Sequence, residues 1–258
     1  MLLAIDIGNS NIVWGIFEGR SLLGHWRLAT DQRRTDDEYG MLFLALLKGA
    51  GYEASHITGA ILSSVVPMLT PTFETMVQTY FRRIPLIVTS EIDSGLTLRY
   101  ANPREIGSDR IVNAAAAHDR YHADLIIVDF GTATTFCVVT KLGEYQGGVI
   151  APGLGISADA LFARTAKLPK VEIMRPKSVV GQDTVSGIQS GLVFGYVGLV
   201  EGILRRMEQE LAYPCRVIAT GGLAPIVARE TASIHEVRPL LTLEGLELLY
   251  RRTAGASS

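Results

Sequence analysis

Short apolar runs alternate with amphipathic stretches along the first half of the chain. An aliphatic run at 2–5 and a β-branched and aromatic run at 12–17 predict two strands joined by a short polar tip. Thr35 and Glu38 have the spacing of a capping box, so a helix is expected to begin at Thr35. The pattern continues with a predicted strand over 57–66, a helix over 70–81 opened by Pro71, and a strand over 84–88.

The same strand-tip-strand pattern returns in the second half. Asp129 and Gly131 follow the apolar run 125–128 with the spacing that Asp6 and Gly8 have after the first run. The two aspartates lie 123 residues apart. Self-similarity of this kind indicates a duplicated unit.

A third glycine turn and two helices complete the second half. A strand at 216–218 runs into Gly221-Gly222, and a long helix is predicted from Thr184 to Leu211. An aliphatic stripe over 242–252 predicts a final helix, which we expect to close the second domain. The fold class is therefore α/β, with two duplicated domains at residues 1–118 and 119–258.

The composition and net charge of the chain bear on which kinds of molecule it binds. Of 258 residues, 48% are hydrophobic and the formal net charge is −2 without a long basic run, so neither nucleic acid nor an anionic membrane is expected as a partner. Two cysteines in strand-like contexts suit a reducing cytoplasm, and the histidines lack metal-ligand spacing. The longest apolar span, 192–200, is far shorter than the roughly 20 residues of a membrane helix.

The polar tip at residues 8–11 suits a phosphate group. Gly8 lacks the Cβ that would hold a ligand away from the backbone N–H groups, and the short side chains after it add donors. Asp6 can face a phosphate only through a cation, so its carboxylate predicts a nearby Mg²⁺. An ordinary hairpin turn at Gly8-Asn9 is the alternative for this segment alone.

The loop 100–110 bends at a proline and a glycine and runs into the alanine-rich helix former 111–117. Asp109 and Arg110 are therefore expected at or near a helix N-terminus. One interpretation is that Ser108 or Asp109 only caps this helix. The other starts from Arg110, whose charge is poorly placed at the positive end of a helix dipole unless an anion such as a substrate carboxylate sits there.

Three motifs in this order resemble type III pantothenate kinase, a family of the acetate kinase, sugar kinase, Hsp70 and actin superfamily. The motifs are Asp6-Ile7-Gly8-Asn9-Ser10, Pro103 followed by Gly107-Ser108-Asp109-Arg110, and Asp129-Phe130-Gly131-Thr132-Ala133-Thr134. The resemblance implies ribonuclease H-like domains with a nucleotide cleft between them. It also implies that a cytoplasmic homodimer uses ATP to convert pantothenate to 4'-phosphopantothenate, the first step of coenzyme A biosynthesis.

The resemblance also carries residue roles. Asp109 would accept the proton of the substrate hydroxyl, Arg110 would bind its carboxylate, and Asp129 would coordinate a monovalent cation, K⁺ or NH₄⁺. Further substrate contacts would come from Tyr100, Gly107, Ser108 and Thr184. ATP would be bound by Asp6, Ile7, Gly8, Asn9, Ser10, Asn11, Ile12, Val13 and Thr132, with Mg²⁺ on the phosphates near Asp6 and with room for adenosine at Gly221-Gly222.

Several alternatives stay open. Many relatives carry alanine at Ser108, and they often carry asparagine at Asp183, so Thr184 is equally well interpreted as a helix N-cap. The small residues of the long helix indicate either tight packing within the subunit or a dimer seam. A dinucleotide fingerprint at Gly153-x-Gly155 is rejected, because Pro152 spoils the required turn. Rival functions are a non-catalytic nucleotide-binding regulator and a kinase of another hydroxy acid or sugar.

Overall fold

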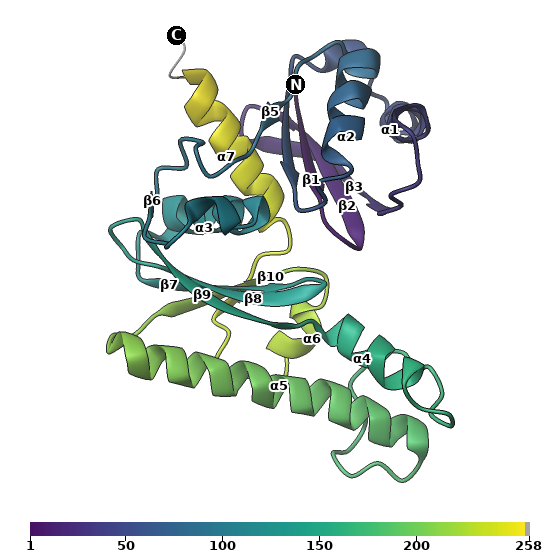
Figure 1. Cartoon of the computed structure of the whole chain (residues 1–258), viewed down its shortest axis with the longest axis vertical. Coiled ribbons are helices and arrows are strands. Elements are labelled where there is room, and N and C mark those ends of the chain that lie inside the picture. The colour runs from purple at the N-terminus through teal and green to yellow at the C-terminus, as the bar shows by residue number, and fades with distance from the viewer. Residues whose placement is uncertain (256–258) are drawn as a thin grey trace. The chain divides into compact units, whose positions relative to one another are not determined.

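The computed structural model describes residues 1–255 and divides into two compact units (Figure 1). The first unit comprises residues 1–96, 100–119 and the C-terminal segment from Leu241. The second comprises Thr97–Arg99 and Arg120–Leu240. Each unit is built on its own mixed sheet, so each is described by itself.

The first sheet has five strands in the order β3-β2-β1-β4-β5. Its strands are β1 (Leu2–Ile7), β2 (Asn11–Glu18), β3 (Ser21–Ala29), β4 (Gly59–Ser64) and β5 (Leu86–Ile87). The helices of this unit are α1 (Asp36–Gly49), α2 (Thr70–Met76) with a π-helical turn at Val77–Phe81, α3 (Ser108–Tyr121) and α7 (Leu241–Gly255), with short 3₁₀ turns at Ala54–His56 and Pro103–Glu105. β1 pairs antiparallel with β2 and parallel with β4, whereas β4 pairs parallel with β5.

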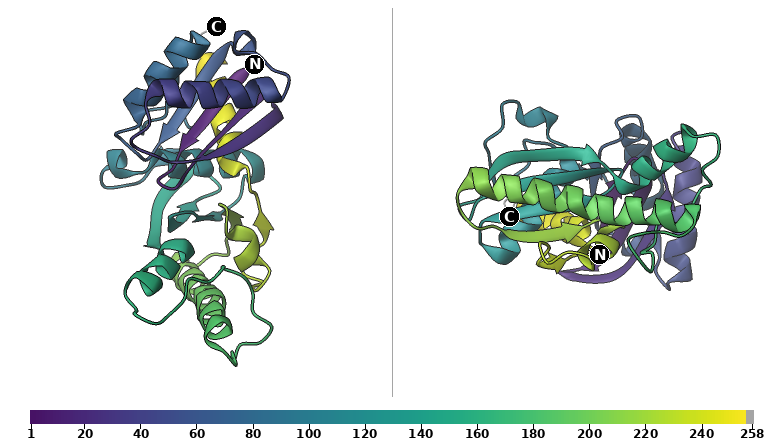
Figure 2. Two further views of the ribbon diagram at one scale, coloured as in Figure 1. Left: turned by 90° about the vertical axis from the view of Figure 1, so that its right-hand side faces the viewer. Right: turned by 90° about the horizontal axis from the view of Figure 1, so that it is seen from below.

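The two faces of the first sheet pack against different helices. Alternate side chains of β1, represented by Ile5, join Phe43 of α1 and Phe73 of α2 in one apolar core, because successive residues of a strand point to opposite faces. The other face carries α7, for which Gly15 and Gly59 leave room beside Leu243 and Tyr250. Figure 2 shows α1 and α7 on opposite sides of this sheet.

The second sheet repeats the first. Its order is β11-β10-β7-β8-β9-β6, and its strands are β6 (Thr97–Leu98), β7 (Leu125–Phe130), β8 (Ala133–Val139), β9 (Glu144–Pro152), β10 (Arg216–Thr220) and β11 (Glu236–Val237). β7 pairs antiparallel with β8 and parallel with β10, as β1 does with β2 and β4. The duplicated α/β fold expected from the two aspartates is thereby confirmed, with β6 as an added edge strand.

Three helices belong to the second unit. They are α4 (Leu154–Ala163), α5 (Thr184–Leu211) and α6 (Ala224–Ala228). Side chains of α5 such as Val200 and Leu204 pack with Val128 and Val217 of the sheet, and α5 runs along one face of that sheet (Figure 1).

Two sequence-based expectations need correction. The final helix does not close the second domain, because α7 packs on β1, β2 and β4 of the first unit; the boundary between residues 118 and 119 stays a prediction about the duplicated halves. The second correction concerns the longest apolar segment, which was expected to be 192–200. The helix α5 as a whole is long and apolar enough to cross a membrane by length and composition. Half of its most apolar stretch is nevertheless buried inside the protein, as in the core helix of a globular domain.

Candidate active site

The first candidate phosphate site is the tip between β1 and β2. The Gly8 N–H donates to the Asn11 carbonyl at 3.0 Å and closes the turn. Thr30, which follows β3, donates its hydroxyl to the Gly8 carbonyl at 2.6 Å and its N–H to the Ser10 carbonyl at 3.1 Å. Three carbonyl oxygens of the tip are therefore turned toward protein donors, which favours a ligand that seeks N–H groups.

The second tip, between β7 and β8, is shorter by one residue. Phe130 pairs with Thr134 across three residues, whereas Ile7 pairs with Ile12 across four. The Gly131 N–H donates to the Ala133 carbonyl, and the Thr132 carbonyl accepts the Gly153 N–H, both at 3.1 Å. The structure therefore contains two tips of the same kind, each closed by a glycine.

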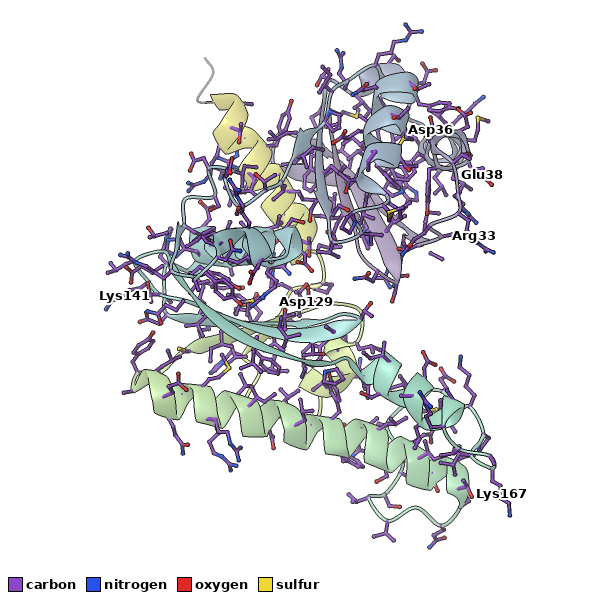
Figure 3. The ribbon with its side chains drawn as sticks, viewed as in Figure 1. Arg33, Asp36, Glu38, Asp129, Lys141 and Lys167 are labelled. Carbon is purple, nitrogen blue, oxygen red and sulfur yellow. The ribbon has the colours of Figure 1, made fainter. Side chains whose placement is uncertain are left out.

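Glycine is required where the chain approaches the second tip. A Cβ on Gly221, which has a φ of +91°, would stand 2.7 Å from an Asp129 carboxylate oxygen and 2.6 Å from the Phe130 carbonyl. A Cβ on Gly153 would collide with the Thr132 and Gly131 carbonyls. The glycine-rich segment before α4 therefore lines the second tip, and Gly221 lies beside Asp129, which Figure 3 labels.

The two aspartates occupy equivalent positions in the two sheets. Asp6 stands opposite Val13 on one side and Ser63 on the other, and Asp129 stands opposite Thr135 and Thr220. Both carboxylates are partly exposed near the carboxyl end of a strand. Within residues 1–255, no three His, Cys, Asp or Glu side chains form a candidate metal cluster.

The candidate ATP-binding residues differ in how much of each is exposed to solvent. The side chains of Ile7 and Ile12 are fully buried in the first core, so only their backbone can face a ligand. Asn9, Ser10 and Asn11 are exposed, and Val13 and Thr132 are partly exposed.

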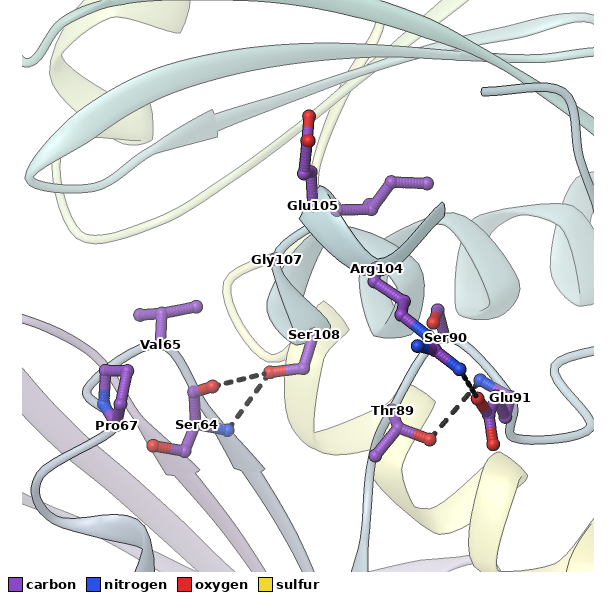
Figure 4. Close-up of a pocket in the computed structure, with 11 residues that line it drawn as sticks. Ser64, Val65, Pro67, Thr89, Ser90, Glu91, Arg104, Glu105, Gly107 and Ser108 are labelled. Atoms are coloured by element: carbon purple, nitrogen blue, oxygen red, sulfur yellow. Dashed lines mark hydrogen bonds and ion pairs between the residues drawn. The ribbon is translucent and has the colours of Figure 1, made fainter. Parts of the chain in front are cut away.

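The loop that carries Asp109 is attached to the end of β4. The Ser108 hydroxyl lies 3.0 Å from the Ser63 hydroxyl, accepts the Ser64 N–H at 3.0 Å and donates to the Ser64 carbonyl at 3.0 Å. Figure 4 shows the Ser108 side chain directed at Ser64. Because β4 lies beside β1, these bonds bring the start of α3 next to the strand end that carries Asp6.

Asp109 lies in the first turn of α3 and is not its N-cap. The Gly107 carbonyl accepts the N–H groups of Arg110 at 3.0 Å and Ile111 at 3.3 Å, so Gly107 occupies the capping position. One Asp109 carboxylate oxygen accepts the Arg110 N–H at 2.7 Å. The Ser108 hydroxyl is bonded to β4, so it does not cap the helix. The Asp109 carboxylate does accept a first-turn N–H group, and a role for it beyond that structural one stays a prediction.

Burial raises the pKa of the Asp109 carboxyl, and the nearby Arg110 opposes that shift only in part. A raised pKa makes a carboxylate a better proton acceptor at neutral pH. Gly107 leaves room for this carboxylate, because a Cβ there would stand 2.6 Å from its Oδ1 atom. Arg110 itself is buried.

A cavity of about 560 Å³ lies beside the Asp109 loop within the first unit (Figure 4). Ser64 and Val65 contribute from the end of β4, Thr89 from the segment after β5, and Gly107 and Ser108 from the start of α3. The Val65 N–H donates to the Ile7 carbonyl at 3.0 Å, which fixes this wall to β1. Ligand sites in α/β sheets commonly lie outside the carboxyl ends of the strands, and the cavity has that position.

The remaining substrate candidates, Tyr100 and Thr184, belong to other segments of the chain. Tyr100 precedes the 3₁₀ turn at Pro103–Glu105 in the first unit. Thr184 is the exposed first residue of α5 in the second unit. The alternative that Thr184 is the N-cap is wrong, because the Asp183 side chain accepts the Ser186 N–H at 2.9 Å and forms the cap.

Two residues in this arrangement escaped the sequence-based interpretation. Thr30 belongs to no motif and lies 22 residues from the carbonyl that it binds. Ser63 is one small residue near the end of an apolar strand. Only the pairing of β3 with β2 shows that Thr30 adjoins the first tip, and only the pairing of β4 with β1 shows it for Ser63.

Comparisons with known proteins bear on the family of the chain. A family model described as type III pantothenate kinase matches residues 2–206. The chain is 52% identical over 252 residues to a type III pantothenate kinase of Myxococcus xanthus, with 98% of each chain covered. It is 54% identical over 252 residues to one of Brevibacillus brevis, covering 98% of this chain and 99% of the relative.

Among solved structures, component A of (R)-2-hydroxyglutaryl-CoA dehydratase from Acidaminococcus fermentans has a TM-score of 0.57 at 13% identity, covering 99% of this chain and 98% of that one. Likeness at this low identity concerns the fold alone. The sequence relatives go further, and with the matched family model they confirm the resemblance seen in the motifs: the chain belongs to the type III pantothenate kinase family.

Proposed function

We propose that this chain transfers the γ-phosphoryl group of ATP to the primary hydroxyl of pantothenate and so catalyses the first step of coenzyme A biosynthesis. Family membership supports the reaction. The observation that carries the residue assignment is the attachment of Ser108 to the end of β4, which places Asp109 near the first tip.

Asp109 acts as the general base in this mechanism. Its carboxylate accepts the proton of the pantothenate hydroxyl while that oxygen attacks the γ-phosphorus and the bond to the β-phosphate oxygen breaks. The products are 4'-phosphopantothenate and ADP. Burial raises the pKa of Asp109, which favours proton acceptance. Positioning and charge neutralisation supply most of the rate in such transfers.

The substrate carboxylate is proposed to lie beside Arg110. The N-terminal end of a helix favours an anion, and Arg110 in the first turn of α3 adds a positive charge there. Gly107 and Ser108 contribute to this wall through their backbone, because the Ser108 hydroxyl is already bonded to β4. Tyr100 and Thr184 are proposed as further substrate contacts on the strength of the family motifs.

Both tips are proposed to bind ATP phosphates through their backbone N–H groups. Carboxylate oxygens are the ligands that hard cations prefer, so Asp6 suits Mg²⁺ held mainly by phosphate oxygens, and Asp129 suits K⁺ or NH₄⁺. The glycines around Asp129 leave its carboxylate unobstructed by a Cβ, which fits a bound cation. When bound, these ions neutralise charge on the phosphates.

A homodimer is proposed from the exposed face of α5. Gly187, Gly191, Gly195 and Gly198 are all exposed, and a Cβ on any of them would meet nothing within 4 Å. Glycine in a helix interior costs about 0.5–1 kcal/mol relative to alanine, and packing inside the subunit does not explain four of them. Close approach by the same helix of a second subunit does. Tyr196 takes no part, because it is buried and bonded to Thr134 and the Pro152 carbonyl.

The proposed setting is the cytoplasm, without a nucleic-acid or membrane partner, because the net charge is −2 and no long basic run is present. The test of function is an ADP-coupled assay with pantothenate against a panel of sugars and hydroxy acids. We expect turnover with pantothenate well above the rest of the panel. A higher rate with another acceptor would show that pantothenate is not the preferred substrate. ATP binding without turnover of any acceptor would indicate a non-catalytic regulator.

A further inference from the structure

Thr30 holds the first tip by a contact that the second tip lacks. Its hydroxyl donates to the Gly8 carbonyl, and its N–H donates to the Ser10 carbonyl. The equivalent residue in the second unit is Gly153. Thr30 follows Ala29, which pairs with Asn11, and Gly153 follows Pro152, which pairs with Ala133. Gly153 repeats the backbone bond, to Thr132, but has no side chain to repeat the other.

The lengths of the tips explain this difference. In the shorter second tip, a Cβ on Gly153 would collide with the two carbonyls of the turn. The first tip has one more residue between its paired strands and accommodates the Thr30 side chain. The longer turn also has more backbone freedom. Among the residues that the structure describes, no glycine packs against the first tip as Gly153 packs against the second, and the Thr30 hydroxyl restrains the Gly8 carbonyl instead.

The residue next to Thr30 is bonded to helix α1. The Tyr39 hydroxyl accepts the Asp31 N–H at 3.0 Å and donates to the Asp31 carbonyl at 2.9 Å. Tyr39 is fully buried on α1. The residue after Thr30 is therefore bonded to the first core, which limits the movement of the Thr30 hydroxyl relative to the tip.

We infer that Thr30 is a positioning residue for the phosphates of ATP. Peptide carbonyl oxygens repel phosphate oxygens, and a turn that rotates a carbonyl toward the ligand loses affinity. By binding the Gly8 and Ser10 carbonyls, Thr30 keeps both oxygens directed into the protein. This inference rests on the proposed role of the first tip in ATP binding, and it adds a residue outside the motifs that support that role.

The test compares Thr30→Val, which keeps the β-branched shape and removes the donor, with Thr30→Ser, which keeps the donor. Thr58→Val is the matched control, because the Thr58 hydroxyl donates to the Met1 carbonyl at 3.2 Å at the opposite end of β1. The measurements are ATP affinity by calorimetry, KM for ATP and for pantothenate, kcat, and thermal midpoint.

For Thr30→Val we expect ATP affinity to fall and KM for ATP to rise, each by about 10-fold, the scale set by loss of one hydrogen bond to a carbonyl left without its partner. KM for pantothenate should change by less than about twofold, because one missing bond at the first tip leaves the Asp109 loop in place. Thr30→Ser should lie close to the parent, and Thr58→Val should bind ATP as the parent does. If Thr30→Val does not fold, Thr30→Ala is measured with the same expectations.

Parent-like ATP affinity in Thr30→Val would overturn the inference. So would equal losses in Thr30→Val and Thr30→Ser, or in Thr30→Val and Thr58→Val, because the hydroxyl at this position would not then be the cause. Failure of the proposed function is a separate result: a parent that binds ATP but does not phosphorylate pantothenate loses its acceptor assignment, and the calorimetric comparison still decides the role of Thr30.

Discussion

The hydroxyl of Ser108 lies 3.0 Å from the hydroxyl of Ser63, and Ser63 is the neighbour of Asp6 in the sheet. Both serines are buried. Through this pair, the residue before Asp109 is attached to the strand beside the first tip. The distance between base and phosphate therefore depends on two small side chains that touch neither substrate in the proposed mechanism.

Many relatives carry alanine at Ser108, so we expect Ser108→Ala to lower kcat by about 10-fold at most while KM for ATP changes little, because the loop loses bonds that position it and the tip is unchanged. The thermal midpoint should also fall, since the Ser64 N–H and carbonyl lose a buried partner. Steady-state kinetics and thermal unfolding measure both effects. Ser55→Ala, at an exposed serine of the same unit, is the control, and an unchanged kcat in Ser108→Ala would show that backbone packing alone holds the loop.

Asp109→Asn should slow phosphorylation by roughly 10²–10⁴-fold, the usual contribution of a positioned general base. Asparagine keeps an oxygen that can accept the Arg110 N–H, so ATP affinity should survive. Asp93→Asn is the matched control, because the Asp93 carboxylate also accepts a backbone N–H, from Gly95 at 3.2 Å, but is exposed. A variant at Asp109 that retains most of the parent rate would leave the mechanism without its base.

The same Asp109→Asn variant gives a pH test of stability. Burial raises the folded-state pKa of Asp109 above its ordinary value of 3.8, so the folded protein binds this proton more tightly than the unfolded chain does. The stability that this group contributes is present below 3.8 and is lost as pH rises through the folded-state pKa. Relative to the parent, the variant should therefore gain in thermal midpoint as pH rises from about 4 toward neutrality, as followed by thermal scans at several pH values. A constant difference across that range would contradict the raised pKa.

Replacement of K⁺ by Na⁺ or by a bulky organic cation should lower turnover, because the Asp129 carboxylate near phosphates needs a cation of suitable size. Initial rates at constant ionic strength provide the measurement. Equal rates in all three salts would remove the cation role of Asp129.

Gly191→Leu should convert the proposed dimer to a monomer, because a large side chain would block close approach at the exposed face of α5. Analytical ultracentrifugation should then give half of the parent mass. The control is Gly49→Leu, at another exposed helical glycine with open space around it, on α1. A parent that sediments as a fully active monomer would refute the seam.

Local patterns explain what could be predicted from the sequence. The capping box at Thr35 and Glu38, the tips at Gly8 and Gly131 and the bounds of α5 depend on neighbouring residues, and the structure contains all of them. Thr30 illustrates what could not be predicted, because its bond to Gly8 requires knowledge that β3 lies beside β2.

Long-range packing decided one expectation that was wrong, and an adjacent residue decided another. The aliphatic stripe of α7 correctly predicts a helix, but it does not indicate which of the two sheets the helix packs against. At Thr184 the competing capping residue was adjacent, and aspartate at position 183 took the cap that threonine would otherwise supply.

Because α7 packs on the first sheet, the first unit of this enzyme can be completed only after α7 has been synthesised. β1, β2 and β4 are complete within the first 64 residues, but the helix that covers Gly15 and Gly59 begins only at Leu241. A nascent chain that ends at Leu240 already contains both tips and Asp109, yet one face of its first sheet is bare. We expect such a truncated product to be captured by chaperones or degraded, so that catalytic competence arrives only after α7 has been synthesised.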